Sequence, residues 1–280
     1  MQIWANTLVK NEERYLWFAV TSVINYLDKV LLWDTGSTDN TMRIIEELKK
    51  TYKQKIDFRE VGNVKSEEFT LIRQQMLEQT KSDWVILVDG DEVWWDDSIK
   101  EIRKIIENSG KSLESVVNRY YNVIGDIFHY QEEKAGKYNI DGKEGHLTIR
   151  AMSMKIPGLH FDKPHGQQGV FDGENTPIQY RDPKKRIFLD KNMYLHFTHM
   201  IRSKNPEEDL KVMKRDIKFK YELGISFPLD FYYPEVFFRP RPDIVSSPWS
   251  RLSKEYYLKA VLQMPIRYLK RRMIRFKSGY

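Results

Sequence analysis

The sequence predicts an α/β fold in which helices cover both faces of a mainly parallel sheet, with a helical extension at the C-terminal end. Two observations indicate this fold. Segments with strand and helix periodicity alternate from residue 3 to residue 88, and strands joined by helices run parallel in one sheet. The last strand of this series, residues 84–88, is entirely apolar, as in strands that are buried on both faces.

The elements of this first part follow from the spacing of their apolar residues. The strands are short apolar runs, and the third strand has the weakest apolar pattern. The first helix repeats apolar residues three and four positions apart, and the second ends in Lys49 and Lys50, which suit the negative end of a helix dipole. The predicted order is strand 3–9, helix 12–27, strand 29–33, helix 41–50, strand 56–60, helix 66–79 and strand 84–88.

After residue 110 the alternation ends. Strands are predicted at 116–124, 146–152 and 193–197, and Gly and Pro punctuate the stretch 136–183. A helix over 207–223 is predicted because Pro206 follows the capping residue Asn205. A link rich in Pro and aromatic residues then leads to a last helical segment.

Composition excludes several classes of function. Without cysteine there are no disulfides or thiolate nucleophiles, and any metal must be bound by oxygen or imidazole. There is no apolar run of about 18 residues and no signal-peptide pattern, so a cytoplasmic protein is expected. The net charge of +6 is concentrated in residues 251–280, where nine Lys or Arg stand against Glu255. This argues against nucleic acid as a partner and favours an anionic surface at that end.

The strongest motif is Asp89-Gly90-Asp91, directly after the buried strand at 84–88. Open α/β sheets bind ligands beyond the carboxyl ends of their strands. Two carboxylates there can bind a hard divalent cation while a diphosphate supplies the other oxygens. Gly90 would allow a close approach of the backbone. The alternative is a solvated acidic turn before the next helix.

A second polar loop runs from Asp34 through Thr35, Gly36 and Asp39, between a strand and a helix. Cap-forming residues at a helix start place polar groups beside its positive end, where anions bind. The loop lacks the glycine pattern of dinucleotide sites and the lysine of P-loops.

These motifs together resemble the family 2 glycosyltransferases, which have the GT-A fold. The resemblance rests on four segments: 9–13 (VKNEE), 33–39 (WDTGSTD), 69–73 and 84–92 (WVILVDGDE). It implies a metal-dependent, inverting transfer of a sugar from a nucleotide-sugar donor, a UDP-sugar by resemblance, to a hydroxyl of a glycan or lipid-linked glycan. It also implies a division into a nucleotide-sugar-binding half (1–110), an acceptor-side half of the same domain (111–205) and a C-terminal extension (206–280).

The resemblance assigns roles to individual residues. It places Leu8, Lys10, Asn11 and Glu12 at the nucleotide, beside Asp34. It places Arg73 near the diphosphate, Asp89 at the ribose and the metal, and Asp91 on the metal, which would be Mn²⁺ or Mg²⁺. Family members often carry a second Asp where this chain has Thr35.

The general base is not fixed by the sequence. A family stretch with a His-Glu pair is faintly similar to residues 150–168, but here His165 is followed by Gly166. The remaining candidates are Glu144, Asp162, Asp172 and Glu174, of which Asp162 is preferred and Glu174 is the second choice of site residue.

His196 and His199 close the strand at 193–197, and His196 is a candidate third metal ligand. At the C-terminal end, Ile266, Leu269, Met273 and Phe276 are spaced like one face of a helix among basic residues. Such a helix can lie on an anionic membrane or pack on the body of the protein, and both remain open.

Three alternative functions also remain at this point. A parallel sheet with Asp-x-Asp suits a nucleotidyltransferase as well, and the Gly166 departure is compatible with a noncatalytic sugar- or nucleotide-binding scaffold. A peripheral nucleic-acid binder would need aromatic platforms beside the basic end, for which Tyr256, Tyr257 and Tyr268 give little support.

Overall fold

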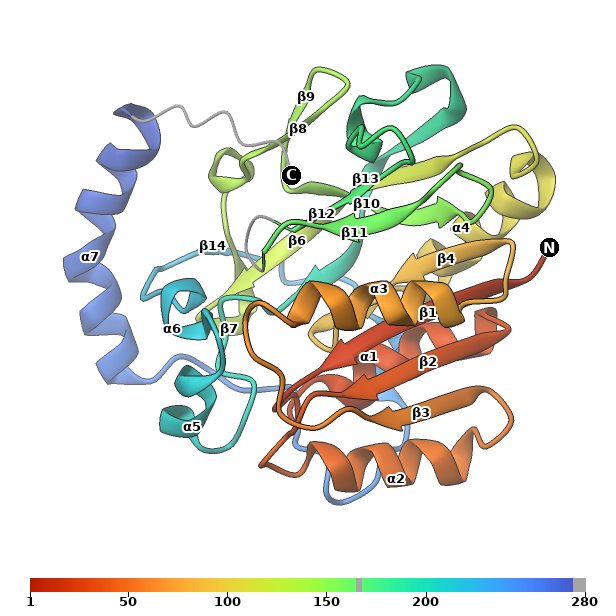
Figure 1. The fold of residues 1–280 in the computed structure, drawn as a ribbon. Coiled ribbons are helices and arrows are strands. Elements are labelled where there is room, and N and C mark those ends of the chain that lie inside the picture. Colours follow the sequence, from red (N-terminus) through yellow and green to blue (C-terminus); the bar gives the residue numbers. More distant parts are fainter. Residues whose placement is uncertain (165–167, 274–280) are drawn as a thin grey trace.

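A large central sheet forms the middle of the molecule in the computed structural model, which describes residues 1–164 and 168–273 (Figure 1). Its ten strands follow the order β14-β7-β6-β10-β4-β1-β2-β3, with β13 beside β6 and β5 beside β13. They are β1 (Ile3–Val9), β2 (Lys29–Asp34), β3 (Ile56–Glu60), β4 (Trp84–Leu87), β5 (Glu92–Trp94), β6 (Ser115–Ile124), β7 (Asp126–Tyr130), β10 (Leu147–Ser153), β13 (Arg186–His196) and β14 (Ile225–Ser226).

The first four of these strands that occur along the chain are parallel, as the alternation of strands and helices predicts. β1 pairs with β2 on one side and β4 on the other, and β2 pairs with β3. Val9 lies opposite Asp34, so the carboxyl ends of β1 and β2 meet at one edge. Beyond β4 the sheet is mixed, because β10 runs antiparallel to β4 and β6 while β13 runs parallel to β6.

Helices cover both faces of the sheet, which confirms the predicted α/β class. The side chains of β2 alternate between two cores: Val30 and Leu32 face the core that contains α1, α2 and α4, and Leu31 and Trp33 face α3. This alternation is the period of two that a strand imposes. The helices are α1 (Leu16–Val23), α2 (Thr41–Thr51), α3 (Phe69–Gln79), α4 (Asp96–Ser109), α5 (Pro206–Lys211), α6 (Arg215–Lys218) and α7 (Lys254–Met273).

Two small hairpins complete the part of the fold that surrounds the site. β8 (Tyr138–Ile140) pairs with β9 (Lys143–Gly145), and β11 (His160–Asp162) pairs with β12 (Gly169–Phe171). Phe161 and Val170 of the second hairpin pack on a separate small core over β10, together with Ile178. This hairpin lies on the same face of the sheet as α3, and Gln74 of α3 accepts a hydrogen bond from the amide of Phe161.

The prediction of one helix over 207–223 is wrong. The chain forms two short helices, because Val212 has extended backbone and Lys214 has a positive φ of 62°. This break turns the chain so that Arg215 donates hydrogen bonds to Asp209 and to the carbonyl of Lys10. Smaller differences are that the helix predicted at 12–27 begins at Leu16, and that the strand predicted at 193–197 is the end of the longer β13.

The helical extension predicted at the C-terminal end is present as α7, which stands at the side of the molecule in Figure 1. Among the described residues, no helix has both the length and the apolar character needed to cross a membrane. Met273 ends α7, whereas Phe276 of the predicted apolar face lies outside the described residues.

Candidate active site

A cavity of about 1090 Å³ lies at the carboxyl edge of the parallel strands. The loops after β1, β2 and β4 form one wall, and β10, β13 and the hairpin β11–β12 form the opposite side. Nine of the residues that the sequence assigns to donor or metal binding line this cavity: Leu8, Lys10, Glu12, Thr35, Arg73, Asp89, Gly90, Asp91 and His196. The crossover connections therefore bring residues from distant parts of the sequence to one site.

The loop that begins at Asp34 is built by its own polar groups. The Asp34 carboxylate accepts hydrogen bonds from the amides of Gly36 and Ser37, each at 2.8 Å. Gly36 has a φ of 82°, and a Cβ there would lie 3.0 Å from backbone atoms of Asn63, so glycine fits this turn best. Asn11 ties this loop to β1, because its side-chain oxygen accepts the Thr38 amide at 2.7 Å.

Four of the residues that the sequence assigns to donor binding support the wall without lining the cavity, namely Asn11, Asp34, Gly36 and Asp39. Asp39 accepts a hydrogen bond from the amide of Thr41 at 2.9 Å at the start of α2.

Gly90 has a packing role in addition to its place in the wall. A Cβ on it would come within 2.9 Å of both Val9 and Glu12, so glycine lets the ends of β1 and β4 approach each other.

Asp89 lies between two guanidinium groups. Arg73 approaches one carboxylate oxygen at 2.8 Å, and Arg150 approaches the other at 3.1 Å. Burial alone would raise the pKa of Asp89, but the charges of Arg150 and Arg73 together hold it below its ordinary value. The carboxylate is therefore ionised and faces the cavity between two cations.

Asp91 is almost fully buried and lies beside His196. Its Oδ2 atom is 3.0 Å from Arg202 Nη1 and 3.5 Å from His196 Nε2, yet it accepts no hydrogen bond. The cations outweigh the effect of burial, so the pKa of Asp91 is well below its usual range. Burial lowers the pKa of His196, so this imidazole tends toward the neutral form that binds metals.

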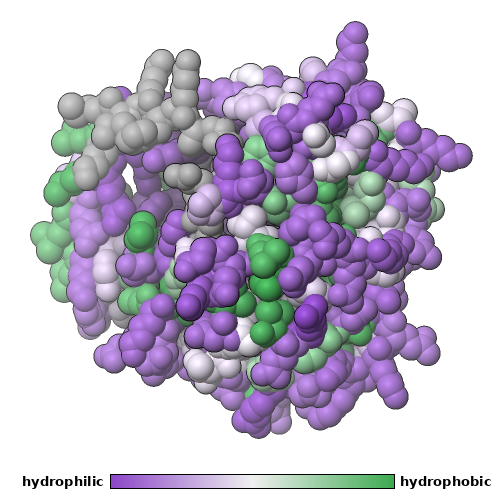
Figure 2. Space-filling view, in the orientation of Figure 1, coloured by the Kyte–Doolittle hydropathy of each residue, from purple (hydrophilic) through white to green (hydrophobic). Residues whose placement is uncertain are grey.

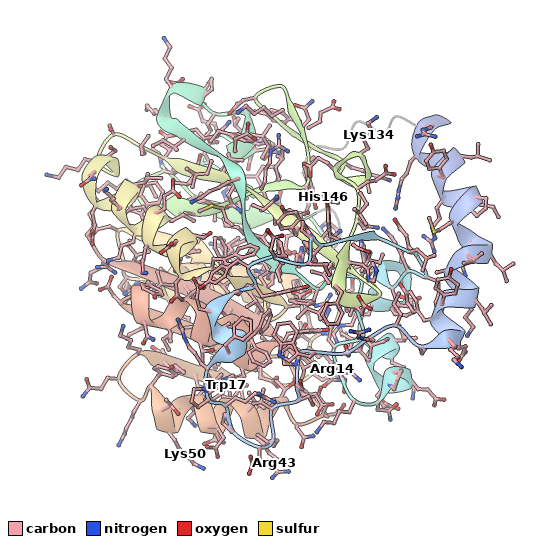
Figure 3. The ribbon with its side chains drawn as sticks, turned by 180° about the vertical axis from the view of Figure 1, so that it is seen from behind. Arg14, Trp17, Arg43, Lys50, Lys134 and His146 are labelled. Atoms are coloured by element: carbon pink, nitrogen blue, oxygen red, sulfur yellow. The ribbon has the colours of Figure 1, made fainter. Side chains whose placement is uncertain are left out.

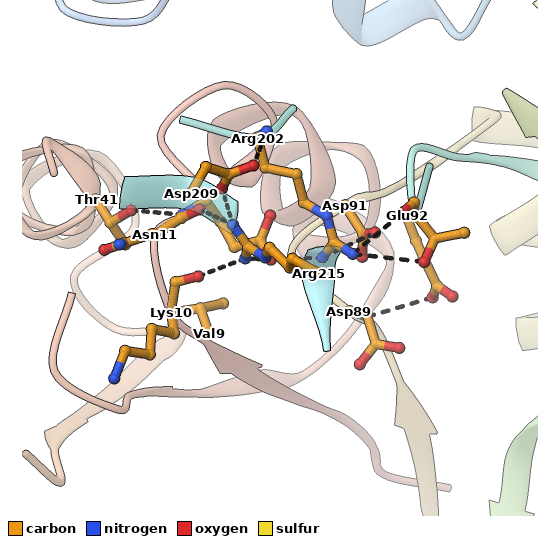
Figure 4. A network of polar contacts seen from close by, with 12 residues as sticks. Val9, Lys10, Asn11, Thr41, Asp89, Asp91, Glu92, Arg202, Asp209 and Arg215 are labelled. Carbon is orange, nitrogen blue, oxygen red and sulfur yellow. Dashed lines mark hydrogen bonds and ion pairs between the residues drawn. The ribbon is translucent and has the colours of Figure 1, made fainter. Parts of the chain in front are cut away.

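Glu12 joins this site to the segment that follows β13. Its Oε1 atom accepts from Arg202 at 2.7 Å and from Arg215 at 2.5 Å. Arg215 also donates to the carbonyl of Asn11 at 2.7 Å and to Asp209 (Figure 4). Burial raises the pKa of Glu12 to about 7, and the two arginines oppose this rise only in part.

A comparison with protein families identifies what kind of chain builds this site. The model of the family described as glycosyl transferase family 2 matches residues 7–166, more than half of the chain. The chain belongs to glycosyl transferase family 2. The matched range contains Glu12, Asp34, Asp89 and Asp91, and it ends before β12.

Three of the solved structures similar to this family 2 chain share little sequence with it. Residues 1–349 of TarS from S. aureus share 16% identity with a TM-score of 0.46, over 71% of this chain and 61% of that one. The Pyrobaculum calidifontis mannosyltransferase PcManGT, in complex with GDP-Man and Mn²⁺, shares 16% with a TM-score of 0.39, over 55% and 45%. Glucosyl-3-phosphoglycerate synthase from Mycobacterium tuberculosis shares 12% with a TM-score of 0.42, over 77% of each chain.

This chain spans about three fifths of the TarS fragment. The search of curated proteins gave no match to its sequence.

The candidate bases of this family 2 chain lie outside the cavity wall. Asp162 and Glu174 are both exposed, although Phe161 and Lys163 on either side of Asp162 line the cavity. Asp172 is buried in a turn, where it accepts the amides of Glu174 and Thr176. Glu144 is exposed on β9, and the departure at His165-Gly166 lies outside the described residues.

Sequence reasoning missed the basic residues that the second part of this family 2 chain contributes. Arg150 comes from β10, Arg202 follows β13, and Arg215 and Lys218 come from α6. Lys218 lies in the cavity wall near Asp91 and Asp89, and desolvation lowers its pKa. The sequence signal for these four basic residues is weak, because isolated basic residues in segments without a motif are normally solvated.

Proposed function

We propose that this chain transfers a sugar from a nucleotide-sugar donor, a UDP-sugar by family resemblance, to an acceptor hydroxyl with inversion. Family membership supports the class of reaction, and the cavity supports the class of donor. In this proposal residues 1–110 bind most of the donor and 206–218 complete the donor wall. Residues 111–205 form the acceptor side and also contribute Arg150 and His196 to the donor site. The acceptor is a glycan or a lipid-linked glycan.

One observation carries the proposal, namely the charge of the cavity wall around the two carboxylates Asp89 and Asp91. Eight Lys or Arg residues line the described wall but only three carboxylates do, Glu12, Asp89 and Asp91. A strongly basic wall at the carboxyl ends of parallel strands suits a diphosphate. We assign Arg73, Arg150 and Lys218 to the diphosphate and Lys10 to the nucleoside end.

The residues present fit a divalent metal that is shared with the donor. Asp91 Oδ2 accepts no hydrogen bond and lies 3.5 Å from His196 Nε2, so one carboxylate oxygen and one imidazole nitrogen face each other, with the Arg202 guanidinium 3.0 Å from the same oxygen. Within the described residues, no group of three or more acidic or His side chains converges on one point. Mg²⁺ and Mn²⁺ accept such a partial set when phosphate oxygens and water supply the rest. When bound, the metal would help to neutralise the departing diphosphate.

The chain's own residues have separate tasks in this mechanism. Arg73 and Arg150 hold Asp89 in its ionised form, where it can accept hydrogen bonds from the donor. The basic wall stabilises the negative charge that develops as the sugar–phosphate bond breaks. We propose Asp162 as the general base that takes the acceptor proton, with Glu174 as the second choice, because Asp162 lies between two residues of the cavity wall.

Release of nucleoside diphosphate from a panel of nucleotide sugars, with Mn²⁺ or Mg²⁺, tests the proposal. We expect slow hydrolysis of one donor, and its loss in Asp91→Asn. The matched control is Asp97→Asn, since this carboxylate is exposed at the start of α4, outside the cavity. Binding without hydrolysis would indicate a scaffold, and pyrophosphate release from a nucleoside triphosphate would indicate a nucleotidyltransferase; either result contradicts the proposal.

A further inference from the structure

Helix α7 is attached to the body of the protein by one face. Ala260 is fully buried and Tyr256 nearly so. The Tyr256 hydroxyl donates to the carbonyl of Lys220 at 2.6 Å. Near the other end of the helix, Arg271 donates to Glu222 at 2.6 Å and to Glu132 at 3.3 Å. These contacts fix the orientation of the helix, so the opposite face is presented outward in a defined way.

The outward face of α7 is apolar over its described length. Leu258, Leu262 and Leu269 are 63%, 76% and 57% exposed, and Val261 and Ile266 flank them at 43% and 60%. Their spacing of three and four residues places them on one side of the helix, opposite Tyr256 and Ala260. Figure 2 shows hydrophobic residues along the left edge, where Figure 1 places α7. A continuous apolar stripe of this kind on a protein surface marks an interaction site.

The charges around this stripe identify the partner. Lys254 and Arg272 lie near the two ends of the helix, and Lys259 lies beside the stripe, where it pairs with Glu255 at 2.5 Å. In sequence, residues 251–280 carry nine Lys or Arg and one acidic residue, while the rest of the chain is slightly acidic. An apolar stripe bordered by cations matches the surface of an anionic bilayer, where acyl chains lie beneath negative headgroups.

The stripe and the cavity share a side of the molecule. β1 and β2 point toward α5 and α6, and α7 lies beyond them (Figure 1). Helix α7 forms hydrogen bonds with Lys220 and Glu222, and this segment follows directly after Lys218 of the cavity wall. A partner that binds the outward face of α7 would therefore lie on the same side of the molecule as the cavity.

We propose that α7 lies flat on an anionic lipid bilayer, with Leu258, Leu262 and Leu269 in contact with the acyl chains. Tyr256 and Arg271 keep the helix on the body, so docking orients the whole protein. This docking does not depend on the proposed function. Its consequence for the reaction, an acceptor hydroxyl presented at the bilayer surface, does rest on that function.

Co-sedimentation with vesicles tests the docking without any donor or catalysis. The vesicles contain phosphatidylcholine alone or a mixture with phosphatidylglycerol. The wild-type chain should bind the mixed vesicles at low salt and bind phosphatidylcholine much less. Burial of one leucine side chain in the bilayer should strengthen binding about tenfold or more. The double variant Leu262→Gln with Leu269→Gln should therefore weaken vesicle binding at least about 100-fold. Leu71→Gln on α3 is the matched control, since Leu71 is 56% exposed and lies outside the stripe.

A second variant tests the charges independently of the apolar stripe. Lys254→Gln with Arg272→Gln should weaken binding to the mixed vesicles about fivefold for each cation and reduce its salt dependence. Circular dichroism checks that both variants keep the fold. Absence of wild-type binding, or equal binding by the leucine variant, would overturn the proposal. Self-association that the leucine variant abolishes, without vesicle binding, would overturn it in favour of a second copy of the chain.

Discussion

The buried cluster around Arg215 allows a strong test of how the cavity wall is held together. Arg215 donates to the carbonyls of Lys10 and Asn11 and to two buried carboxylates, Glu12 and Asp209. The variant Arg215→Met keeps much of the volume of the side chain but removes its charge and all of these donors. Both carboxylates then lose a charged partner in the protein interior.

The size of the effect follows from this loss. Removal of one partner of a buried ion pair costs about 3–5 kcal/mol, because it leaves an uncompensated buried charge. For domains of roughly this size, each kcal/mol lowers Tm by about 2–4 °C. Arg215→Met should therefore lower Tm by about 6–20 °C. Arg43→Met is the control, since Arg43 is exposed on α2 and donates one long hydrogen bond of 3.4 Å to Asn40 (Figure 3). It should change stability by less than about 0.5 kcal/mol.

Thermal unfolding followed by circular dichroism measures both variants, and a double-mutant cycle with Glu12→Gln assigns the cause. In the Glu12→Gln background, Arg215→Met should cost less by about 0.5–3 kcal/mol, since one of the two carboxylates that lose the Arg215 contact is already gone. Equal Tm values for Arg215→Met and Arg43→Met, or strict additivity with Glu12→Gln, would refute the reasoning.

Three further predictions concern single side chains of the site. Burial raises the pKa of Glu12 to about 7 from 4.5, so the folded state retains a proton that the unfolded state releases. The contribution of Glu12 to the free energy of unfolding should therefore fall as pH rises from about 4.5 to 7. Denaturant titrations at several pH values should show this fall in the wild-type chain and not in Glu12→Gln. Gly36→Ala forces a positive φ of 82° on a residue with a Cβ, and the urea midpoint should show a loss of about 1–2 kcal/mol. Lys218→Met removes a cation from the cavity wall and should weaken binding of a nucleoside diphosphate about tenfold in calorimetry at low salt; unchanged affinity would show that Lys218 does not contact the diphosphate.

The first half of the fold could be predicted because its signals are local. The apolar run at 84–88 needs no partner in the sequence to be recognised as a buried strand. Once four strands alternate with helices, the rule for crossover connections brings Asp34, Asp89 and Glu12 to the same edge of the sheet. Two of these three line the cavity directly, and Asp34 shapes the loop beside it.

The second half could not be predicted because its structure depends on contacts between distant residues. The helix expected over 207–223 breaks where Lys214 has a positive φ, and the contacts of Arg215 with Lys10, Glu12 and Asp209 accompany that break. No local pattern reports an arginine that pairs with a glutamate about 200 residues earlier. The same holds for Arg150, which lies in an apolar strand yet pairs with Asp89.

The position of the metal tests the central claim most directly. Crystals grown with a nucleoside diphosphate and Mn²⁺ would show the ion through its anomalous scattering. We expect the peak between Asp91 and His196, with the diphosphate against Arg73, Arg150 and Lys218. An ordered nucleotide outside this cavity, or Mn²⁺ bound away from both Asp91 and His196, would contradict the account.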